Sequence, residues 1–508
     1  MPATPVPSVP DLRAQFEAIV TNLTSEEAQT VSADTMERRL LSQVLALGRA
    51  LFALFLARRA AATDGAVDRD PAGVERPYHD ARTRGYLSIF GRVAFTRPYF
   101  YRQGEGGRAP VDDLLSLPPT VYSDLVRETA EELGVGEAYH KGLDVLRRLL
   151  GLALSTRTLQ EQVAEDAPAV EAFYAQEEPP LPAEEAAILV LQADGKGVPI
   201  VRPSKATAGT PPPRRLGKGQ KRGGKKEATL TAIYTIAPAV RTPEAVVESL
   251  FRDPAQAAGG DADRAAREGP RHKRLWVTLA GKDAALAEAA ARVARRDGTH
   301  ITHRVALTDG SQALQERVQR HFPTFTLVLD LIHVTEYLWK AANALHGETD
   351  PRRTAWVKTR TLRLLRSQSA AVVADLRHLA QATVCPRRAR TVLTKVAAYL
   401  ERNAPYMDYA AYLARGWPIA TGVIEGACRH LVKDRCELSG MRWTIAGAEA
   451  LLHLRAVHEN GDWDAYHAFR RRQRHQRLYA VPYPDEAVAP LDLHALAPCA
   501  DAPLAFAA

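Results

Sequence analysis

The spacing of hydrophobic residues predicts two kinds of architecture along the chain. From residue 1 to 175 apolar positions recur mostly with helical spacing, most clearly over 34–61. Residues 86–101 alternate between apolar and polar side chains around Gly91, which predicts a β-hairpin. Another pair of helices is expected on either side of Gly151, with Ser155 capping the second. The first 175 residues are therefore predicted to be mainly helical, with one hairpin.

Beyond an acidic, proline-containing linker the pattern becomes that of a mixed α/β sheet. Short apolar runs predict five strands, over 186–194, 227–236, 273–281, 303–309 and 325–330. Helical patterns over 282–296 and 311–322 separate the last three strands. We therefore expect a sheet-containing domain over 187–332, a helical insertion over 333–415, the rest of the domain over 416–465, and a basic tail over 466–508 formed by a frayed helix and a disordered end.

Carboxylates stand at the ends of three of these apolar runs. Asp194, Asp309 and Asp330 each close a strand, and Glu425 follows the helical insertion. Carboxylate oxygens are the ligands that Mg²⁺ and Mn²⁺ prefer, and two such ions can serve a phosphoryl transfer. Each aspartate alone could equally be a helix N-cap that follows a strand. The whole set favours a metal centre, because capping alone does not account for four such acids.

Composition and charge restrict the class of protein and its partner. The chain has 508 residues, enough for two to four domains, and its 46% hydrophobic and 25% charged residues are ordinary for a soluble globular protein. A formal charge of +8 and a pI near 9.2 favour a polyanionic partner, with nucleic acid the leading candidate. Four scattered cysteines fit a reducing cytoplasm. No signal peptide is recognised, and residues 40–57, interrupted by polar side chains, are expected to fall short of a membrane span.

Several basic residues are candidates for phosphate contacts. The segment 203–226 is predicted to be a disordered loop, either simply solvated or touching a nucleic-acid backbone, with the basic residues Arg214, Arg215, Lys218, Lys221, Arg222, Lys225 and Lys226. Lys196 flanks Asp194 and could steady a phosphate. The helices around Gly151 have helix-turn-helix spacing, although helical hairpins without a DNA role look alike. Their second helix would present Arg157, Thr158, Gln160 and Gln162 to a groove.

Five motifs together resemble a known family. Within residues 80–465, the segments LQADGKG, TDGSQALQERVQRHFP, LDLIHVTEYLW, TGVIEGACRHLVKDR and SGMRW are similar to those of transposases of bacterial ISKra4-type insertion sequences, relatives of the Mutator and IS256 groups. The resemblance implies a ribonuclease H-like core interrupted by a helical insertion. In such a sheet the first and fourth strands are neighbours, so that Asp194 and Asp309 would meet. The long basic loop maps to no role in that family.

The resemblance also implies roles for the acids. Asp194, Asp309 and Glu425 would be a DDE triad that holds two Mg²⁺ ions, for which Mn²⁺ could substitute. Asp330 and His333 match an Asp-x-x-His signature with a supporting role. A helix N-terminus disfavours an added proton, so His333 is expected to be neutral. The DNA surface would include Arg429, Lys433 and Arg435 after Glu425, together with Arg442 and Trp443.

The implied protein is a cytoplasmic, nucleoid-associated transposase. It would bind terminal inverted repeats, cleave DNA and transfer the 3′ ends to target DNA, acting as a homodimer or a larger assembly and without a membrane. The mainly helical residues 1–175 would serve DNA binding or oligomerisation. Two alternatives stay open from the residues alone: a metal-dependent nuclease of the same fold without strand transfer, and a non-catalytic DNA-binding protein descended from a transposase.

Overall fold

The protein is described by a computed structural model that covers residues 6–65, 67–69, 73–201, 224–252, 268–383, 385–438, 440–479 and 481–484. The chain divides into two compact units. The first contains Met1–Gly134, Tyr139–Gln162 and Asp464–Ala508, and the second contains Val135–Ala138 and Val163–Trp463. Five residues of the predicted basic loop lie outside the described residues, namely Arg214, Arg215, Lys218, Lys221 and Arg222.

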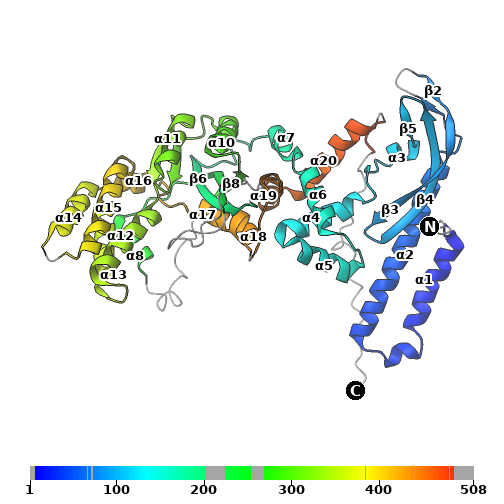
Figure 1. The fold of residues 1–508 in the computed structure, drawn as a ribbon, viewed down its shortest axis with the longest axis horizontal. Coiled ribbons are helices and arrows are strands. Elements are labelled where there is room, and N and C mark those ends of the chain that lie inside the picture. The colour runs from blue at the N-terminus through cyan, green and yellow to red at the C-terminus, as the bar shows by residue number, and fades with distance from the viewer. Residues whose placement is uncertain are drawn as a thin grey trace, which may run out of the picture. The chain divides into compact units, whose positions relative to one another are not determined.

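The first unit joins a helical hairpin to a three-stranded antiparallel sheet (Figure 1). The predicted β-hairpin is present, although its first strand begins at Tyr78 instead of Tyr86. Leu56 of the long second helix packs with Tyr86, Phe95 and Val111 in a small buried core. The elements up to this sheet are α1 (Val9–Leu23), the 3-10 helix η1 (Glu27–Thr30), α2 (Ala33–Ala61), β1 (Asp68–Arg69), β2 (Glu75–Arg76), β3 (Tyr78–Ser88), β4 (Gly91–Arg102) and β5 (Gly106–Arg108).

The long helix α2 differs from expectation in one respect. By length and composition it is apolar enough to cross a membrane, contrary to the prediction that residues 40–57 fall short of a span. Over its 29 residues only Leu56 and Ala60 are buried. Four of its large apolar side chains are exposed, namely Leu41, Val44, Leu51 and Phe55.

The predicted helix pair around Gly151 is present. It lies among α3 (Pro110–Leu114), α4 (Asp124–Gly136), α5 (Tyr139–Leu150) and α6 (Thr156–Asp166). Gly151 has a φ of +67° after α5, a conformation that favours glycine, and Ser155 Oγ accepts a hydrogen bond from the Thr158 amide at 3.0 Å. Arg157 is exposed and pairs with Glu161. The prediction for Gln162 is wrong, because this side chain is only 4% exposed and is not available to a groove.

The C-terminal basic helix is ordered and belongs to the core of the first unit. The predicted frayed helix in 466–508 is instead α20 (Trp463–Leu478), which buries Arg474. Arg474 pairs with Asp124 of α4, with Nη2 2.9 Å from Oδ2, and Arg471 pairs with Glu128 of the same helix. Separating these pairs would leave buried charges without partners. The pairs therefore stabilise the packing of α20 against α4. Residues from 485 onward lie outside the described residues.

The second unit is built on a five-stranded mixed sheet. All five predicted strands are present: β6 (Ile188–Pro199), β7 (Lys225–Ile236), β8 (Arg271–Thr278), β9 (His303–Thr308) and β10 (Thr326–Leu329). Their order is β10-β9-β6-β7-β8, with β6, β9 and β10 parallel and β7 antiparallel to both of its neighbours. The predicted contact between the first and fourth strands, β6 and β9, is therefore confirmed.

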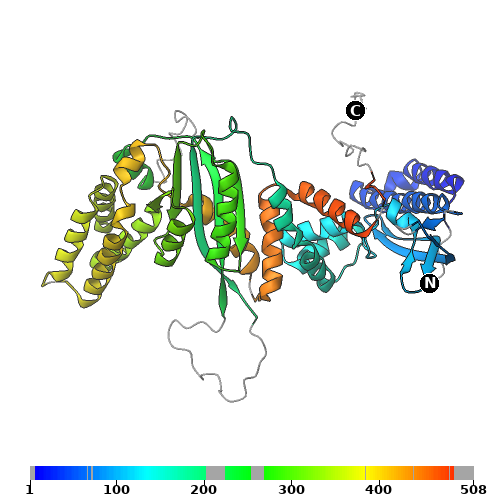
Figure 2. The same cartoon turned by 90° about the horizontal axis from the view of Figure 1, so that it is seen from above.

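The central strand β6 sends alternate side chains to opposite faces of the sheet. Leu189, Leu191 and Ala193 pack in the cluster that contains α10 (Lys282–Arg296) and α11 (Gln312–His321). Ile188 and Val190 pack in the larger cluster formed with the helical insertion. Because side chains two residues apart share a face, Gln192 and Asp194 face the side of the insertion. Figure 2 shows the sheet with helices against it.

The predicted insertion is helical throughout its described part. It consists of α12 (Leu331–His346), α13 (Arg352–Leu365), α14 (Ser369–Gln381), α15 (Arg387–Asn403), the 3-10 helix η2 (Ala404–Tyr406) and α16 (Tyr409–Ala414). The chain then returns to the sheet through α17 (Gly422–Ala427), the π-helix η3 (Cys428–Lys433), α18 (Asp434–Cys436) and α19 (Ile445–Glu459). The remaining helices are α7 (Ala169–Gln176), in the segment before the sheet, and α8 (Pro243–Leu250), after β7.

Candidate active site

The sequence predicted that Asp194 closes its strand. In the structure it lies inside β6. It pairs with Leu230 of β7, and the strand continues to Pro199. Its Oδ1 accepts a hydrogen bond from the Gly195 amide at 2.6 Å, and its Oδ2 accepts one from the Cys428 thiol at 3.3 Å. Burial raises the pKa of this carboxyl above its ordinary value, and the negative charge of Asp309 adds to the rise. The two acids are thus near enough to repel each other.

A buried glutamine joins the helix of Glu425 to the same strand. Gln192 precedes Asp194 by two residues on one face of β6, and its Oε1 accepts a hydrogen bond from the Ile424 amide at 2.9 Å. Its Nε2 donates to the Tyr234 hydroxyl at 2.9 Å and to the Ala420 carbonyl at 3.3 Å. These bonds fix the start of α17 against β6. Glu425 is therefore held on the side of β6 that Asp194 faces.

Glu425 is partly exposed and carries a perturbed carboxyl. Burial raises its pKa, and the charge of Asp330 and then that of Asp194 raise it further. Its Oε1 accepts a hydrogen bond from the Thr421 hydroxyl at 3.3 Å. Repulsion among neighbouring carboxylates is what a bound divalent cation would relieve.

Asp309 stands directly after β9, where a tight turn and the insertion hold it. Its Oδ1 accepts a hydrogen bond from the Ser311 amide at 2.8 Å. The next residue, Gly310, has a φ of +86° and no room for a side chain, since an added Cβ would lie 2.6 Å from the Tyr399 hydroxyl oxygen. Tyr399 and Arg402 of α15 donate to the backbone carbonyls of Asp309 and Gly310, each at 3.0 Å. The helical insertion therefore fixes the backbone that presents this acid.

Asp330 is the N-cap of α12 and a fully buried hydrogen-bond acceptor. Its carboxylate accepts from the amides of Ile332 and His333, and from both the amide and the hydroxyl of Thr421, at distances from 2.8 to 3.3 Å. The Nδ1 atom of His333 lies 2.6 Å from its Oδ2. For this aspartate the capping interpretation is confirmed, and its oxygens are occupied by protein donors.

The pKa of His333 is raised, contrary to the expectation that a helix N-terminus would favour its neutral form. Its hydrogen bond with Asp330 raises its pKa to about 9, and the negative charges of Asp330 and Asp309 contribute. A helix N-terminus changes the free energy of a nearby charge by only about 0.3–1 kcal/mol, which a buried carboxylate in contact outweighs. The Nδ1 atom of His333 also lies 3.7 Å from Oε1 of Glu425.

The ion pair between His333 and Asp330 predicts a pH-dependent stability. Because the folded-state pKa of His333 is raised to about 9, its contribution is complete below its unfolded pKa near 6.5 and is lost as the pH rises through about 9. In metal-free protein, the excess unfolding free energy of the wild type over His333→Gln should fall by about 2 kcal/mol between pH 6 and 10. Urea denaturation of both proteins measures this difference, and an excess that does not change with pH would contradict the pairing.

Two sets of donors compete for the role of metal ligands. Among the described residues, single ligand atoms of Asp330, His333 and Glu425 lie within 4.8 Å of one another. Asp330 has its oxygens occupied by protein donors, however, and Nδ1 of His333 is already engaged by Asp330 at 2.6 Å. By contrast, Oδ2 of Asp309 and Oε2 of Glu425 accept no hydrogen bond from the part of the chain that the structure describes. Open carboxylate oxygens fit Mg²⁺ better, which favours Asp309 and Glu425. Asp194 accepts bonds from the Gly195 amide and the Cys428 thiol, and it is grouped with these two acids because its charge interacts with both of them.

The predicted phosphate-binding residues divide into exposed and buried ones. Arg435 is fully buried with its guanidinium 5.0 Å from the centre of the Trp443 ring, and Trp443 is also buried and donates to the Cys436 carbonyl. The prediction that these two contact DNA is therefore wrong, and both stabilise the packing behind α17. Lys196 is half-buried near Cys428, and Lys225, the first residue of β7, pairs with Glu437 after α18. The candidates that remain exposed near this helix and strand are Lys226, Arg429, Lys433 and Arg442.

Several residues of the site escaped the sequence interpretation. Gln192, Thr421, Cys428, Tyr399 and Arg402 all support the acids through hydrogen bonds to them or to their backbone. Only Gln192 carried a signal, because it is a polar residue within an apolar strand and shares the face of Asp194. The others come from segments far away in sequence, and their roles depend on tertiary contacts.

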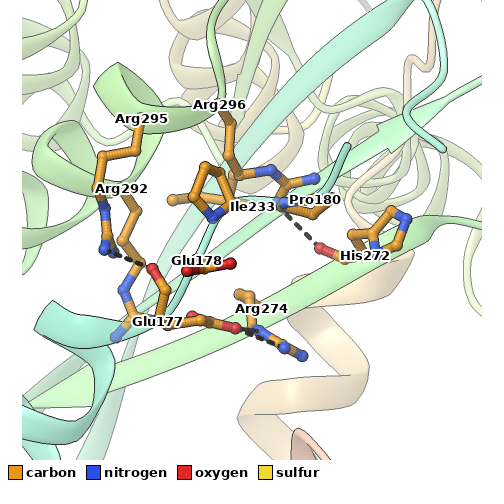
Figure 3. Close-up of a pocket in the computed structure, with 10 residues that line it drawn as sticks. Glu177, Glu178, Pro180, Ile233, His272, Arg274, Arg292, Arg295 and Arg296 are labelled. Atoms are coloured by element: carbon orange, nitrogen blue, oxygen red, sulfur yellow. Dashed lines mark hydrogen bonds and ion pairs between the residues drawn. The ribbon is translucent and has the colours of Figure 1, made fainter. Parts of the chain in front are cut away.

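A second charged cluster lies on the sheet and has a structural explanation. The pocket in Figure 3 is lined by arginines that fasten the linker between residues 174 and 185. Arg295 donates to the carbonyls of Tyr174, Ala175 and Glu177, and Arg296 pairs with Glu185 at 2.7 Å. Because these guanidinium groups already bind the protein's own oxygens, the pocket adds nothing to the candidate site.

Comparisons with known proteins give structural similarity but no match by sequence. No protein-family model matches the chain, and no curated protein matches its sequence. Among solved structures, the chain is similar to the Drosophila P element transposase strand transfer complex, with 8% sequence identity and a TM-score of 0.24, over 69% of this chain and 81% of that one.

Proposed function

We propose that this protein is a DDE transposase of the ISKra4 type, which cleaves DNA at transposon ends and joins the 3′ ends to target DNA. The observation that supports this proposal is the position of three acids from distant segments. Asp194 and Asp309 come from adjacent parallel strands, and Glu425 is held to the first of these strands by Gln192. The strand order β10-β9-β6-β7-β8 is also that of a ribonuclease H-like sheet.

The residues have distinct roles in the proposed reaction. Two Mg²⁺ ions, when bound, would supply activation of the attacking oxygen and stabilisation of the leaving oxygen. Asp194, Asp309 and Glu425 would hold them. Asp330 orients His333 through their 2.6 Å contact, and protonated His333 would offer a positive charge to a phosphate beside Glu425. Gln192, Tyr399 and Arg402 keep the acids in position.

The test of this function is a cleavage and joining assay. Purified protein is incubated with labelled terminal-repeat DNA, a target plasmid and Mg²⁺ or Mn²⁺. We expect labelled ends joined to the plasmid, with no products when EDTA is present. Cut ends without joined products would instead identify a nuclease, and DNA binding without cleavage would identify a non-catalytic DNA-binding protein.

A transposase that acts on two ends requires more than one copy, and the helical hairpin of the first unit offers a surface for this. Helices α1 and α2 pack together, and each exposes large apolar side chains at intervals of three, four or seven residues, which places them on one face of the helix. They are Val9, Phe16, Val20 and Leu23 on α1, and Leu41, Val44, Leu51 and Phe55 on α2. Such seams fit the facing helices of a four-helix bundle.

Charge on this seam should therefore separate the copies. We expect the wild-type protein to be a dimer and the variant with Leu51→Glu and Phe55→Glu to be a monomer, with half the mass by light scattering after size exclusion. Leu149→Glu, on an equally exposed leucine of α5, is the matched control and should leave the dimer intact. A monomeric wild type contradicts the interface. Partition of the wild type into lipid vesicles, lost in the double variant, would assign the seam to a membrane.

A further inference from the structure

Positive charge is concentrated in the helical insertion. Residues 331–415 contain fourteen lysines and arginines against six aspartates and glutamates, a formal charge of +8 in less than a fifth of the chain. Some of these cations serve the fold. Arg360 and Arg363 pair with Asp375, Arg366 pairs with Glu244, and Arg377 pairs with Glu401.

Three exposed cations stand in line along α15. Arg388, Lys395 and Arg402 are each seven residues apart, so they occupy one face of this helix with about 10.5 Å of rise between successive members. The positions between them on that face are Thr391 and Ala398, which are exposed and uncharged. We call this face the α15 stripe. It presents positive charge without an intervening acid over about 21 Å.

The cations of the α15 stripe are not used by the protein as ion pairs. Within the part of the chain that the structure describes, Arg388 and Lys395 form no ion pair, unlike the arginines named above. A single exposed cation is ordinarily only solvated. A row of three on an acid-free helix face is better suited to a partner with regularly spaced negative charge.

The C-terminal end of the α15 stripe lies beside Asp309. At its C-terminal end Arg402 donates to the Gly310 carbonyl, one residue after Asp309, and the neighbouring Tyr399 donates to the carbonyl of Asp309 itself. Tyr399 stacks on Tyr337 of α12 with 3.8 Å between ring centres, and the Lys340 ammonium lies 4.3 Å from the centre of the Tyr337 ring. Helix α12, which begins at Leu331 directly after Asp330, thus carries a lysine alongside this end of α15, and this lysine also pairs with Glu336 at 3.8 Å.

We propose that the α15 stripe binds the phosphate backbone of the substrate DNA as it leaves the acidic centre. This rests on the proposed function, because it assumes that DNA is the molecule held at Asp194, Asp309 and Glu425. The length of the stripe corresponds to about six base pairs at 3.4 Å per pair. Contacts of this kind carry no sequence information, so the stripe holds flanking or target DNA in register without selecting the repeat.

The test measures the salt dependence of duplex binding by fluorescence anisotropy. The variant with Arg388→Ala and Lys395→Ala removes two exposed cations and leaves Arg402, which supports the loop of Asp309. We expect a loss of affinity of roughly tenfold or more, equal for duplexes of different sequence, and a decrease of about 2 in the slope of log affinity against log salt. The matched control, Arg352→Ala with Arg377→Ala, removes two exposed arginines of the same insertion that already pair with acids. It should bind DNA nearly as the wild type does.

The outcomes separate this inference from the proposed function. Wild-type affinity and salt slope in the Arg388 and Lys395 variant would overturn the stripe, even if the wild type cleaves and joins DNA. An equal loss in the control would also overturn it, since the effect would then reflect total charge. A selective loss in a protein that never cleaves DNA would support the stripe and refute only the transposase. A wild type that binds no duplex refutes both.

Discussion

Replacing Asp309 with asparagine is expected to slow DNA cleavage by about 10³-fold or more while leaving the binding of DNA ends nearly unchanged. A metal ion contributes several kcal/mol to a phosphoryl transfer, and each 1.36 kcal/mol is a factor of ten in rate. Asparagine keeps an oxygen for the 2.8 Å hydrogen bond from the Ser311 amide, so the turn after β9 should persist. Initial rates on a labelled end substrate and anisotropy with the same DNA measure the two effects.

The matched control for this variant is Asp283→Asn. Asp283 is an exposed carboxylate on α10 that pairs with Arg317 at 2.8 Å, and its replacement removes the same charge from the chain. Its cleavage rate should equal that of the wild type. Cleavage by Asp309→Asn at the wild-type rate would refute the role of this acid, and a parallel loss of end binding would show that the variant disturbs more than the metal site.

Replacing Asp330 with asparagine is expected to destabilise the protein more than any exchange among the other three acids. The buried carboxylate accepts from two amides of α12, from the amide and hydroxyl of Thr421 and from His333. An asparagine NH₂ group cannot accept, so donors on that side would be buried without partners. We expect the unfolding free energy of metal-free protein to fall by about 3 kcal/mol or more, measured by urea denaturation.

Thr421→Val is the graded companion to this variant. It removes one of the same hydrogen bonds and leaves the carboxylate, so its cost should be smaller, about 1 kcal/mol. If Asp330 were instead a metal ligand, Asp330→Asn would leave the stability of metal-free protein unchanged and would weaken Mn²⁺ binding. That pattern would contradict the role of Asp330 as the acceptor that joins α12 to α17.

The strands and helices around the site could be predicted because their signals are local. The five apolar runs, and the helix over 282–296, follow periodicities that a short window reveals. The extension of β6 beyond Asp194 could not be predicted this way. Gly195 to Pro199 is held by pairing with the polar start of β7 and by the Trp443 amide, which donates to the Pro199 carbonyl at 3.0 Å. A strand with polar neighbours on a projecting arm has no apolar alternation to reveal it.

The acids of the candidate site were named from the sequence, but the residues that surround them were not. Strand ends and a helix start suggested Asp194, Asp309, Asp330 and Glu425 as a set, and the resemblance separated Asp330 from the others. The exposure of Arg435 and the pKa of His333 were predicted wrongly for a shared reason. Each depends on a contact made by folding, the first with Trp443 and the second with Asp330. Residue type and position in a helix influence the exposure and the pKa of a side chain less than such contacts do.

We propose that the divalent ions are held by Asp194, Asp309 and Glu425, and not by the closer group of Asp330, His333 and Glu425. The most direct measurement is Mn²⁺ binding by electron paramagnetic resonance, on the wild type, Asp309→Asn and His333→Gln in the presence of end DNA. With these ligands, we expect Asp309→Asn to weaken Mn²⁺ binding at least tenfold and His333→Gln to bind Mn²⁺ as tightly as the wild type. Loss of Mn²⁺ in His333→Gln, with binding retained in Asp309→Asn, would contradict this proposal.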